Sequence, residues 1–252
     1  MLEFTGSLHL SAGEWGLLIL SAALTGMSKT GLQGATLIIA PALAIVFGGK
    51  ESAGLLLPML VIADVFAVYY YRRHAEWKYL FRLAPFTMAG VFLGIYVGDA
   101  ISDDQFKSLM GVIILASLAL MIWREWKKSD DKIPDAWWFS AAAGLAGGFS
   151  TMIGNAAGPV MAVYLLSMRL PKNVYIGTGA WFFLLLNVFK VPFHILVWET
   201  ISFQSFSINL LMAPVILAGA ILGVGIIKKI PEKPYRIFII VMTAAAALRL
   251  VF

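Results

Sequence analysis

The sequence predicts an all-α polytopic membrane protein. Of the 252 residues, 60% are hydrophobic and only 13% are charged, and the mean hydropathy of +0.86 is too high for a chain that folds in water. Apolar stretches recur along the whole chain, and a glycine-rich polar segment interrupts them twice. These three observations favour one transmembrane domain over residues 1–252, with about 8 to 10 membrane helical segments.

The composition excludes several classes of protein. The chain has no cysteine, which excludes disulfides, thiolate metal sites and cysteine catalysis, and its three histidines lack the spacing of metal ligands. We therefore expect no cofactor, no metal site and no enzymatic activity. The net charge of +5 does not predict a nucleic-acid partner, because basic residues in a membrane protein set its orientation. The N-terminus lacks the pattern of a cleaved signal peptide, so we expect the first apolar segment to be retained.

The apolar stretches fall into two length classes. Six come close to the roughly 20 residues that a spanning helix needs, at 52–71, 79–98, 105–123, 174–198, 205–227 and 235–252. Four are shorter, at 14–27, 32–47, 136–152 and 156–168. A run of about 14 residues covers only about 21 Å of a core that is roughly 30 Å thick. We therefore expect two short re-entrant or broken helical hairpins, each followed by three transmembrane helices.

Basic residues predict the orientation of these helices, because lysine and arginine are retained on the cytoplasmic side. Of the 19 basic residues, 14 fall in four segments, at 72–82, 124–132, 169–172 and 228–236. Placing these four segments in the cytoplasm puts both termini on the outside.

This topology predicts two repeats of inverted topology. Residues 10–124 would begin outside and end inside, residues 136–252 would begin inside and end outside, and residues 125–135 would be a cytoplasmic linker. Matching motifs support a duplication, since Asp64-Val-Phe corresponds to Asn187-Val-Phe about 122 residues later, which is also the spacing of the two glycine-rich segments. The alternative is chance similarity among small apolar residues.

The two glycine-rich segments predict the functional site. The first reads Gly26-Met-Ser-Lys-Thr-Gly-Leu-Gln-Gly34 and the second reads Gly148-Phe-Ser-Thr-Met-Ile-Gly-Asn-Ala-Ala-Gly158. Polar backbone inside an apolar protein is costly unless it lines a cavity or binds a ligand. We expect a helix to start after each segment, at about Leu32 and about Ala156, and to point its N–H groups toward a central cavity. The glycines would let the backbone turn and approach a ligand, or alternatively would serve close helix packing.

Neutral donors and a lysine in these segments favour a small oxyanion. The candidate substrate-binding residues are Ser28, Lys29, Thr30, Gly31, Gln33, Gly34, Ser150, Thr151, Gly154, Asn155, Gly158, Asn187 and Lys190. Thr151 stands where the first segment has Lys29, so we expect the first segment to anchor charge and the second to be a neutral partner. Alternatively, Lys29 extends to a membrane interface.

Three ionisable residues lie in later apolar segments. A lone ammonium there costs several kcal/mol, so Lys190 should have a partner. Asp64 is interpreted either as the ion-pair partner of Lys190 or as a proton carrier. His194 is interpreted as a residue hydrogen-bonded between helices or, alternatively, as a proton relay.

The two glycine-rich segments, followed by Pro41 and Pro159, resemble those of the sulfite exporter TauE/SafE family of membrane permeases. That family carries two such motifs, one opening each half, and the resemblance spans nearly the full chain. It implies transport of sulfite, organosulfonates or related sulfur-containing anions in the bacterial inner membrane, with both termini then periplasmic.

From the repeats and this resemblance we expect a secondary transporter that exports such an anion by alternating access. A passive anion channel and proton-coupled uptake of an organosulfonate or another small anion are the alternatives. The expected partners are the anion and the lipid bilayer, and the sequence leaves open whether protons or a second copy in a homodimer take part.

Overall fold

The fold is all-helical in the part of the chain that the structure describes, a computed structural model covering residues 10–30, 35–71, 75–127, 137–168, 170–226 and 232–252. In these residues there are ten helices and no strands, which confirms the predicted fold class. The helices are α1 (Ala12–Thr30), α2 (Ala35–Phe47), α3 (Gly49–Tyr71), α4 (Trp77–Ala100), α5 (Asp103–Lys127), α6 (Trp137–Gly154), α7 (Gly158–Ser167), α8 (Lys172–Leu196), α9 (Phe203–Ile226) and α10 (Glu232–Val251).

Among the residues that the structure describes, five helices are long and apolar enough to cross a membrane, namely α3, α4, α5, α8 and α9. They correspond to five of the six long stretches expected from the sequence. The sixth, α10, is a helix of 20 residues that carries charged residues near both ends, including Glu232 and Arg249. The predicted linker at 125–135 lies mostly outside the described residues, and α5 continues to Lys127.

The four shorter helices occur where the two hairpins were expected. With 13 and 10 residues, α2 and α7 rise only about 20 Å and about 15 Å, too little to cross a core of roughly 30 Å. The glycine-rich segments, however, are more helical than predicted. α1 continues to Thr30 and α6 to Gly154, so the break between α6 and α7 is confined to residues 155–157, and α7 begins at Gly158 rather than at about Ala156.

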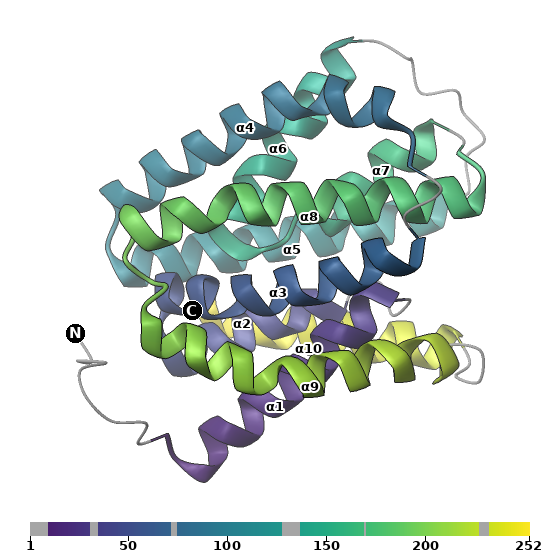
Figure 1. The fold of residues 1–252 in the computed structure, drawn as a ribbon. Coiled ribbons are helices and arrows are strands. Elements are labelled where there is room, and N and C mark those ends of the chain that lie inside the picture. The colour runs from purple at the N-terminus through teal and green to yellow at the C-terminus, as the bar shows by residue number, and fades with distance from the viewer. Residues whose placement is uncertain (1–9, 31–34, 72–74, 128–136, 169, 227–231) are drawn as a thin grey trace.

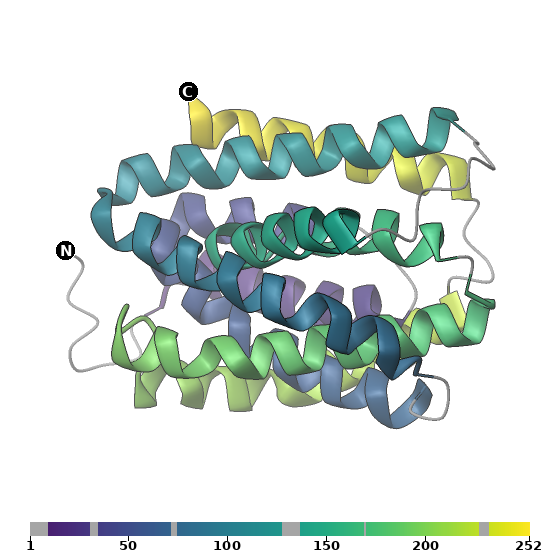
Figure 2. The same cartoon turned by 90° about the horizontal axis from the view of Figure 1, so that it is seen from above.

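The helices form two layers that do not correspond to the two halves of the sequence (Figure 1). The first layer contains α1, α2, α3, α9 and α10, and the second contains α4, α5, α6, α7 and α8. The most extensive packing within the layers joins α1 to α9 and α4 to α6, while α3 against α8 and α5 against α10 form most of the seam between the layers. Figure 2 shows α5 beside α10 along this seam.

The chain direction is alike for the helices that precede the basic segments. In Figures 1 and 2, α3, α5, α7 and α9 all end at the right-hand end of the molecule. Each of the four basic segments begins in the last turn of one of these helices or after its end, as the predicted topology requires. Which end faces the cytoplasm stays a prediction.

Glycines allow the closest helix crossings. A Cβ on Gly26 of α1 would clash with the carbonyl oxygen of Ile216 in α9, and a Cβ on Gly148 of α6 would clash with that of Thr87 in α4. The expectation that Gly26 and Gly148 turn the backbone toward a ligand is therefore wrong. Both lie inside helices and serve the close packing that small residues permit in membranes.

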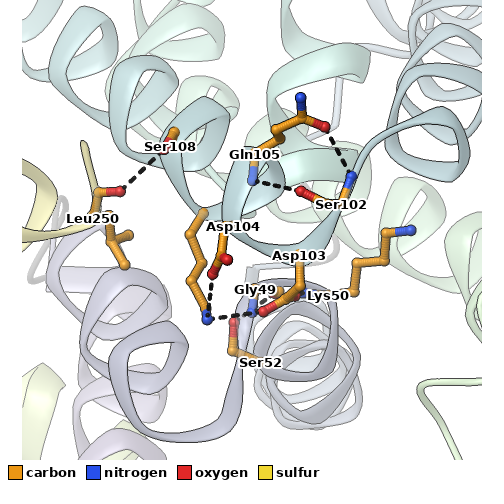
Figure 3. Close-up of polar contacts among 10 residues, drawn as sticks. Gly49, Lys50, Ser52, Ser102, Asp103, Asp104, Gln105, Ser108 and Leu250 are labelled. Atoms are coloured by element: carbon orange, nitrogen blue, oxygen red, sulfur yellow. Dashed lines mark hydrogen bonds and ion pairs between the residues drawn. The ribbon is translucent and has the colours of Figure 1, made fainter. Parts of the chain in front are cut away.

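The first turn of α3 is held by a carboxylate from α5 (Figure 3). Asp103 Oδ1 accepts the backbone N–H groups of Gly49 and Lys50 at 2.9 and 3.2 Å, and Lys107 Nζ lies 2.9 Å from Asp103 Oδ2. Gly48 precedes this turn with a φ of 97°, a left-handed conformation that glycine adopts without strain. A carboxylate at a helix N-terminus is stabilising, so Asp103 links the two layers at one end of the seam.

Candidate functional site

Six polar residues gather where α1, α3, α6 and α8 approach one another. We call them the buried polar cluster, and they are Lys29, Asp64, Thr151, Asn155, Asn187 and Lys190. Asp64 and Lys190 are fully buried, and Asn187 is 1% exposed. Buried charges need partners, so the contacts of this cluster decide what it can do.

Lys29 pairs with Asp64. Lys29 Nζ lies 2.8 Å from Asp64 Oδ1 and 4.4 Å from the centre of the Phe183 ring, a cation–π contact. The other carboxylate oxygen of Asp64 accepts a hydrogen bond of 2.6 Å from Asn187 Nδ2. The expected ion pair between Asp64 and Lys190 is therefore wrong, because the last turn of α1 brings Lys29 closer. Lys29 is also only 12% exposed, so it does not extend to an interface.

Lys190 is held by the C-terminal end of α6. Its Nζ donates to Thr151 O and Thr151 Oγ1, both at 3.0 Å, and to Asn155 Oδ1 at 2.7 Å. Three acceptors match the three N–H donors of an ammonium group. Thr151 lies in the last turn of α6, at the negative end of the helix dipole, and its carbonyl oxygen also accepts the backbone N–H of Asn155 at 3.1 Å. Within the described residues, Lys190 is hydrogen-bonded to this helix end and has no carboxylate at ion-pair distance, while Asp64 acts on it at longer range.

Asn155 ends α6 and ties the break between α6 and α7 to α3. Its φ of 52° lies in the left-handed region, which commonly ends a helix and which asparagine tolerates better than most residues. Its side-chain Nδ2 donates to Ala53 O at 3.4 Å. The sequence could not indicate Ala53, because a backbone carbonyl leaves no side-chain signal.

The face of α8 that meets the cluster has a clear helical spacing. Phe183, Asn187, Lys190 and His194 follow one another at intervals of four, three and four residues, so they lie on one face of the helix. Phe183 was not among the residues predicted from the sequence, although its position one turn before Asn187 was a usable signal.

The remaining candidate residues are less closely connected to the cluster. Ser150 is buried and bonds within its own helix, to Gly147 O at 3.2 Å, and Ser28 is buried in α1. A Cβ on Gly154 would approach Met110 at 3.3 Å, which indicates packing against α5. A Cβ on Gly158 would meet no atom within 4 Å, so open space lies beside the first residue of α7. The side chain of Thr30, and Gly31, Gln33 and Gly34, lie outside the described residues.

His194 belongs to a separate group of contacts. Its Nδ1 is 2.8 Å from Thr200 Oγ1, and its ring meets the edge of Trp198 at a centroid distance of 5.0 Å. Its Nε2 is buried without a hydrogen-bond partner in the described part of the chain. The structure therefore places His194 one turn beyond Lys190 but brings it into contact with neither Asp64 nor Lys29 among the contacts that it describes.

The buried polar cluster contains more positive than negative charge. Two ammonium groups, Lys29 and Lys190, face one carboxylate, Asp64. Since an uncompensated charge is costly in a low-dielectric interior, this excess favours the binding of an anion.

Comparison with known proteins places the whole chain in one group. The model of the family described as sulfite exporter TauE/SafE matches residues 18–250, nearly the full length. No curated protein and no solved structure matches the chain. The match begins in α1 and ends in α10, and it includes every residue of the buried polar cluster.

Proposed function

Because the chain belongs to the sulfite exporter TauE/SafE family, we propose that it exports sulfite or a related small sulfur-containing oxyanion or organosulfonate across the bacterial inner membrane. Family membership and five long apolar helices make it a multi-pass membrane transporter. The observation that supports the choice of an anion is the positive excess of the buried polar cluster. The cluster lies among helices from both halves of the chain, as a central transport site would.

The proposed substrate site has the buried polar cluster at its centre. Thr151, Asn155 and Lys190 meet at the end of α6, and Lys29 and Asn187 meet at Asp64. Around them we retain Ser28, Thr30, Gly31, Gln33, Gly34, Ser150, Gly154 and Gly158 as candidate contacts from the two glycine-rich segments.

We propose that alternating access moves the two layers, rather than the two sequence halves, against each other. The close crossing of α1 on α9 joins helices from different halves, and so does the crossing of α6 on α4. Moving one half past the other would separate both crossings, whose backbones are in direct contact. Movement at the seam, between α3 and α8 and between α5 and α10, leaves them intact.

Polar contacts across the seam support this mechanism. Asp64 in the first layer accepts a hydrogen bond from Asn187 in the second, and Asn155 in the second layer donates to Ala53 in the first. Two states that alternate at the seam would break and remake such contacts around the substrate. The Asp103 carboxylate at the first turn of α3 would close one end of the seam in the state observed.

Matching crossings also support the proposed duplication. Gly90 in α4 would clash through a Cβ with Leu145 O, and Gly219 in α9 with Ala23 O. Ala23 and Leu145 are 122 residues apart, as are Gly26 and Gly148. Gly90 and Gly219 are 129 residues apart, as are Thr87 and Ile216. We therefore retain inverted repeats, over residues 10–124 and 136–252, as the proposed origin of the fold.

Export needs no further energy source if the anion moves alone. With the cell interior negative, the exit of one negative charge gains about 2.3 kcal/mol per 100 mV. Uptake would instead require protons or counter-ions, and Asp64 and His194 are the candidates to carry protons in that case.

Flux of radiolabelled sulfite in proteoliposomes tests the proposed function. We expect saturable flux that accelerates when the compartment holding the anion is made negative, a much lower flux in Lys190→Gln, and no change in Lys78→Gln, whose exposed side chain lies outside the cluster. Unitary currents far above the turnover of a carrier would identify a channel, and flux that requires a proton gradient would identify proton-coupled uptake. Absence of flux for sulfite, thiosulfate and methanesulfonate alike would contradict the proposal.

A further inference from the structure

The structure points to a substrate that carries a single negative charge. We infer that Lys190 is the charge anchor of the site, and that the site selects monovalent sulfur oxyanions, such as sulfonates and hydrogensulfite, over divalent ones. This inference rests on the proposed function, since it concerns the substrate class of the same site.

The first step is that Lys29 already has a counter-ion. Its ammonium group lies 2.8 Å from Asp64 Oδ1, and the second oxygen of Asp64 is held by Asn187 at 2.6 Å. Asp64 thus contacts both Lys29 and Asn187 with its two oxygens, as two oxygens of an anionic substrate would. The expectation that Lys29 alone anchors the anion does not fit this geometry.

The second step is that Lys190 keeps an unbalanced charge. It is fully buried, and the acceptors around its Nζ are a carbonyl, a hydroxyl and an amide oxygen, none of which is ionised. Gly158, three residues after Asn155, borders open space at the first turn of α7. In that turn Pro159 has no N–H and the Met161 N–H donates to Ala157 O at 2.9 Å. The N–H groups of Gly158 and Val160 are the further donors at the positive end of the helix dipole, and an anion that binds Lys190 would replace one of its neutral acceptors.

The third step is the charge balance. One carboxylate and two ammonium groups leave one positive charge in the buried polar cluster, which a monovalent anion would neutralise. A divalent anion would leave one negative charge uncompensated in the interior, which is costly. The balance therefore discriminates by valence and not by size.

The chain offers a matched series of variants, because Asp64 and Asn187 occupy corresponding positions and are hydrogen-bonded to each other. Asp64→Asn removes one negative charge from the cluster, and Asn187→Asp adds one. The double variant Asp64→Asn with Asn187→Asp restores the original charge with the carboxylate on the opposite helix.

The test is equilibrium binding of methanesulfonate and sulfate, which are both tetrahedral but differ in charge, to the full-length protein purified in detergent. We expect the wild type to bind methanesulfonate at least about tenfold more tightly than sulfate. Asp64→Asn should shift the preference toward sulfate, Asn187→Asp should weaken both anions, and the double variant should bring back the preference for methanesulfonate. Lys190→Gln should lose methanesulfonate binding.

The outcomes separate this inference from the proposed function. Wild-type protein that binds neither these probes nor sulfite and thiosulfate would overturn both. Wild-type binding with an unchanged preference in Asp64→Asn, or with full methanesulfonate affinity in Lys190→Gln, would overturn the valence selection alone. If a single variant fails to fold, the double variant decides, because it preserves the charge balance: a preference for sulfate there would overturn the inference.

Discussion

At the scale of residues, the identity of each ion-pair partner determines the chemistry of the site. The burial of Lys190 in an apolar segment predicted that it needs a partner, and it has one in the end of α6. The sequence did not predict that Asp64 would instead pair with Lys29. Helical spacing specifies the face on which a residue lies, but the partner depends on which other helix packs on that face.

The buried pair of Lys29 and Asp64 should contribute to stability as a pair. We expect Asp64→Asn to lower the free energy of unfolding by about 3–5 kcal/mol, because it leaves the ammonium of Lys29 buried without its counter-ion. Adding Lys29→Met should recover most of this loss. A double-mutant cycle from denaturant unfolding in detergent measures both effects.

The ion pair between Lys107 and Asp103 provides the matched control. Its side chains are 28% and 45% exposed, so Lys107→Met should cost less than about 1 kcal/mol. If Lys29→Met fails to rescue Asp64→Asn, the pair does not account for the loss.

At the scale of elements, glycines determine how closely the helices cross. The local sequence around Gly26 and Gly148 is equally compatible with a tight turn and with close helix packing. The neighbouring helix decides, and here α9 and α4 fill the space that a Cβ would need.

Substitution at these crossings should push the helices apart. Gly148→Ala places a Cβ against the backbone of Thr87, so we expect a loss of about 1–3 kcal/mol or more in the free energy of unfolding. Gly26→Ala should behave alike because its crossing matches. Thermal unfolding of the detergent-solubilised protein measures the change.

Gly16→Ala is the control for this prediction. A Cβ at Gly16 would meet no atom within 4 Å, and alanine is favoured over glycine in a helix by up to about 1 kcal/mol. Equal destabilisation by all three substitutions would show that the crossings are not responsible.

At the scale of the whole molecule, the two layers are the proposed moving bodies. Because the chain has no cysteine, pairs of cysteines can be introduced within a layer or across the seam. A Cβ added at Gly111 or Gly94 would lie close to the Cβ of a residue on the neighbouring helix. Because the added Cβ also crowds that helix, the flux of each oxidised pair is compared with the flux of the same pair in its reduced form.

Cross-linking the seam should stop transport, whereas cross-linking within a layer should not. The pair Gly111→Cys and Leu250→Cys joins α5 to α10 across the seam, and the pair Gly94→Cys and Met152→Cys joins α4 to α6 within the second layer. Oxidation of the first pair should abolish sulfite flux until a reductant is added, with little effect of oxidising the second. Each pair also joins the two halves of the sequence, so loss of flux on oxidising both pairs would show that the halves, and not the layers, move.

The sequence by itself determined that this protein lies in a lipid bilayer, that it is helical, and to which family it belongs. Hydropathy and segment length require a bilayer and predict the short hairpins, because these properties act locally along each segment. Only the tertiary structure decided that helices of the two halves interlock, that Gly26 and Gly148 pack rather than turn, and that Lys29 rather than Lys190 neutralises Asp64. Each of these depends on contacts between helices far apart in the sequence, where close approach and the cost of a buried charge select one partner among several.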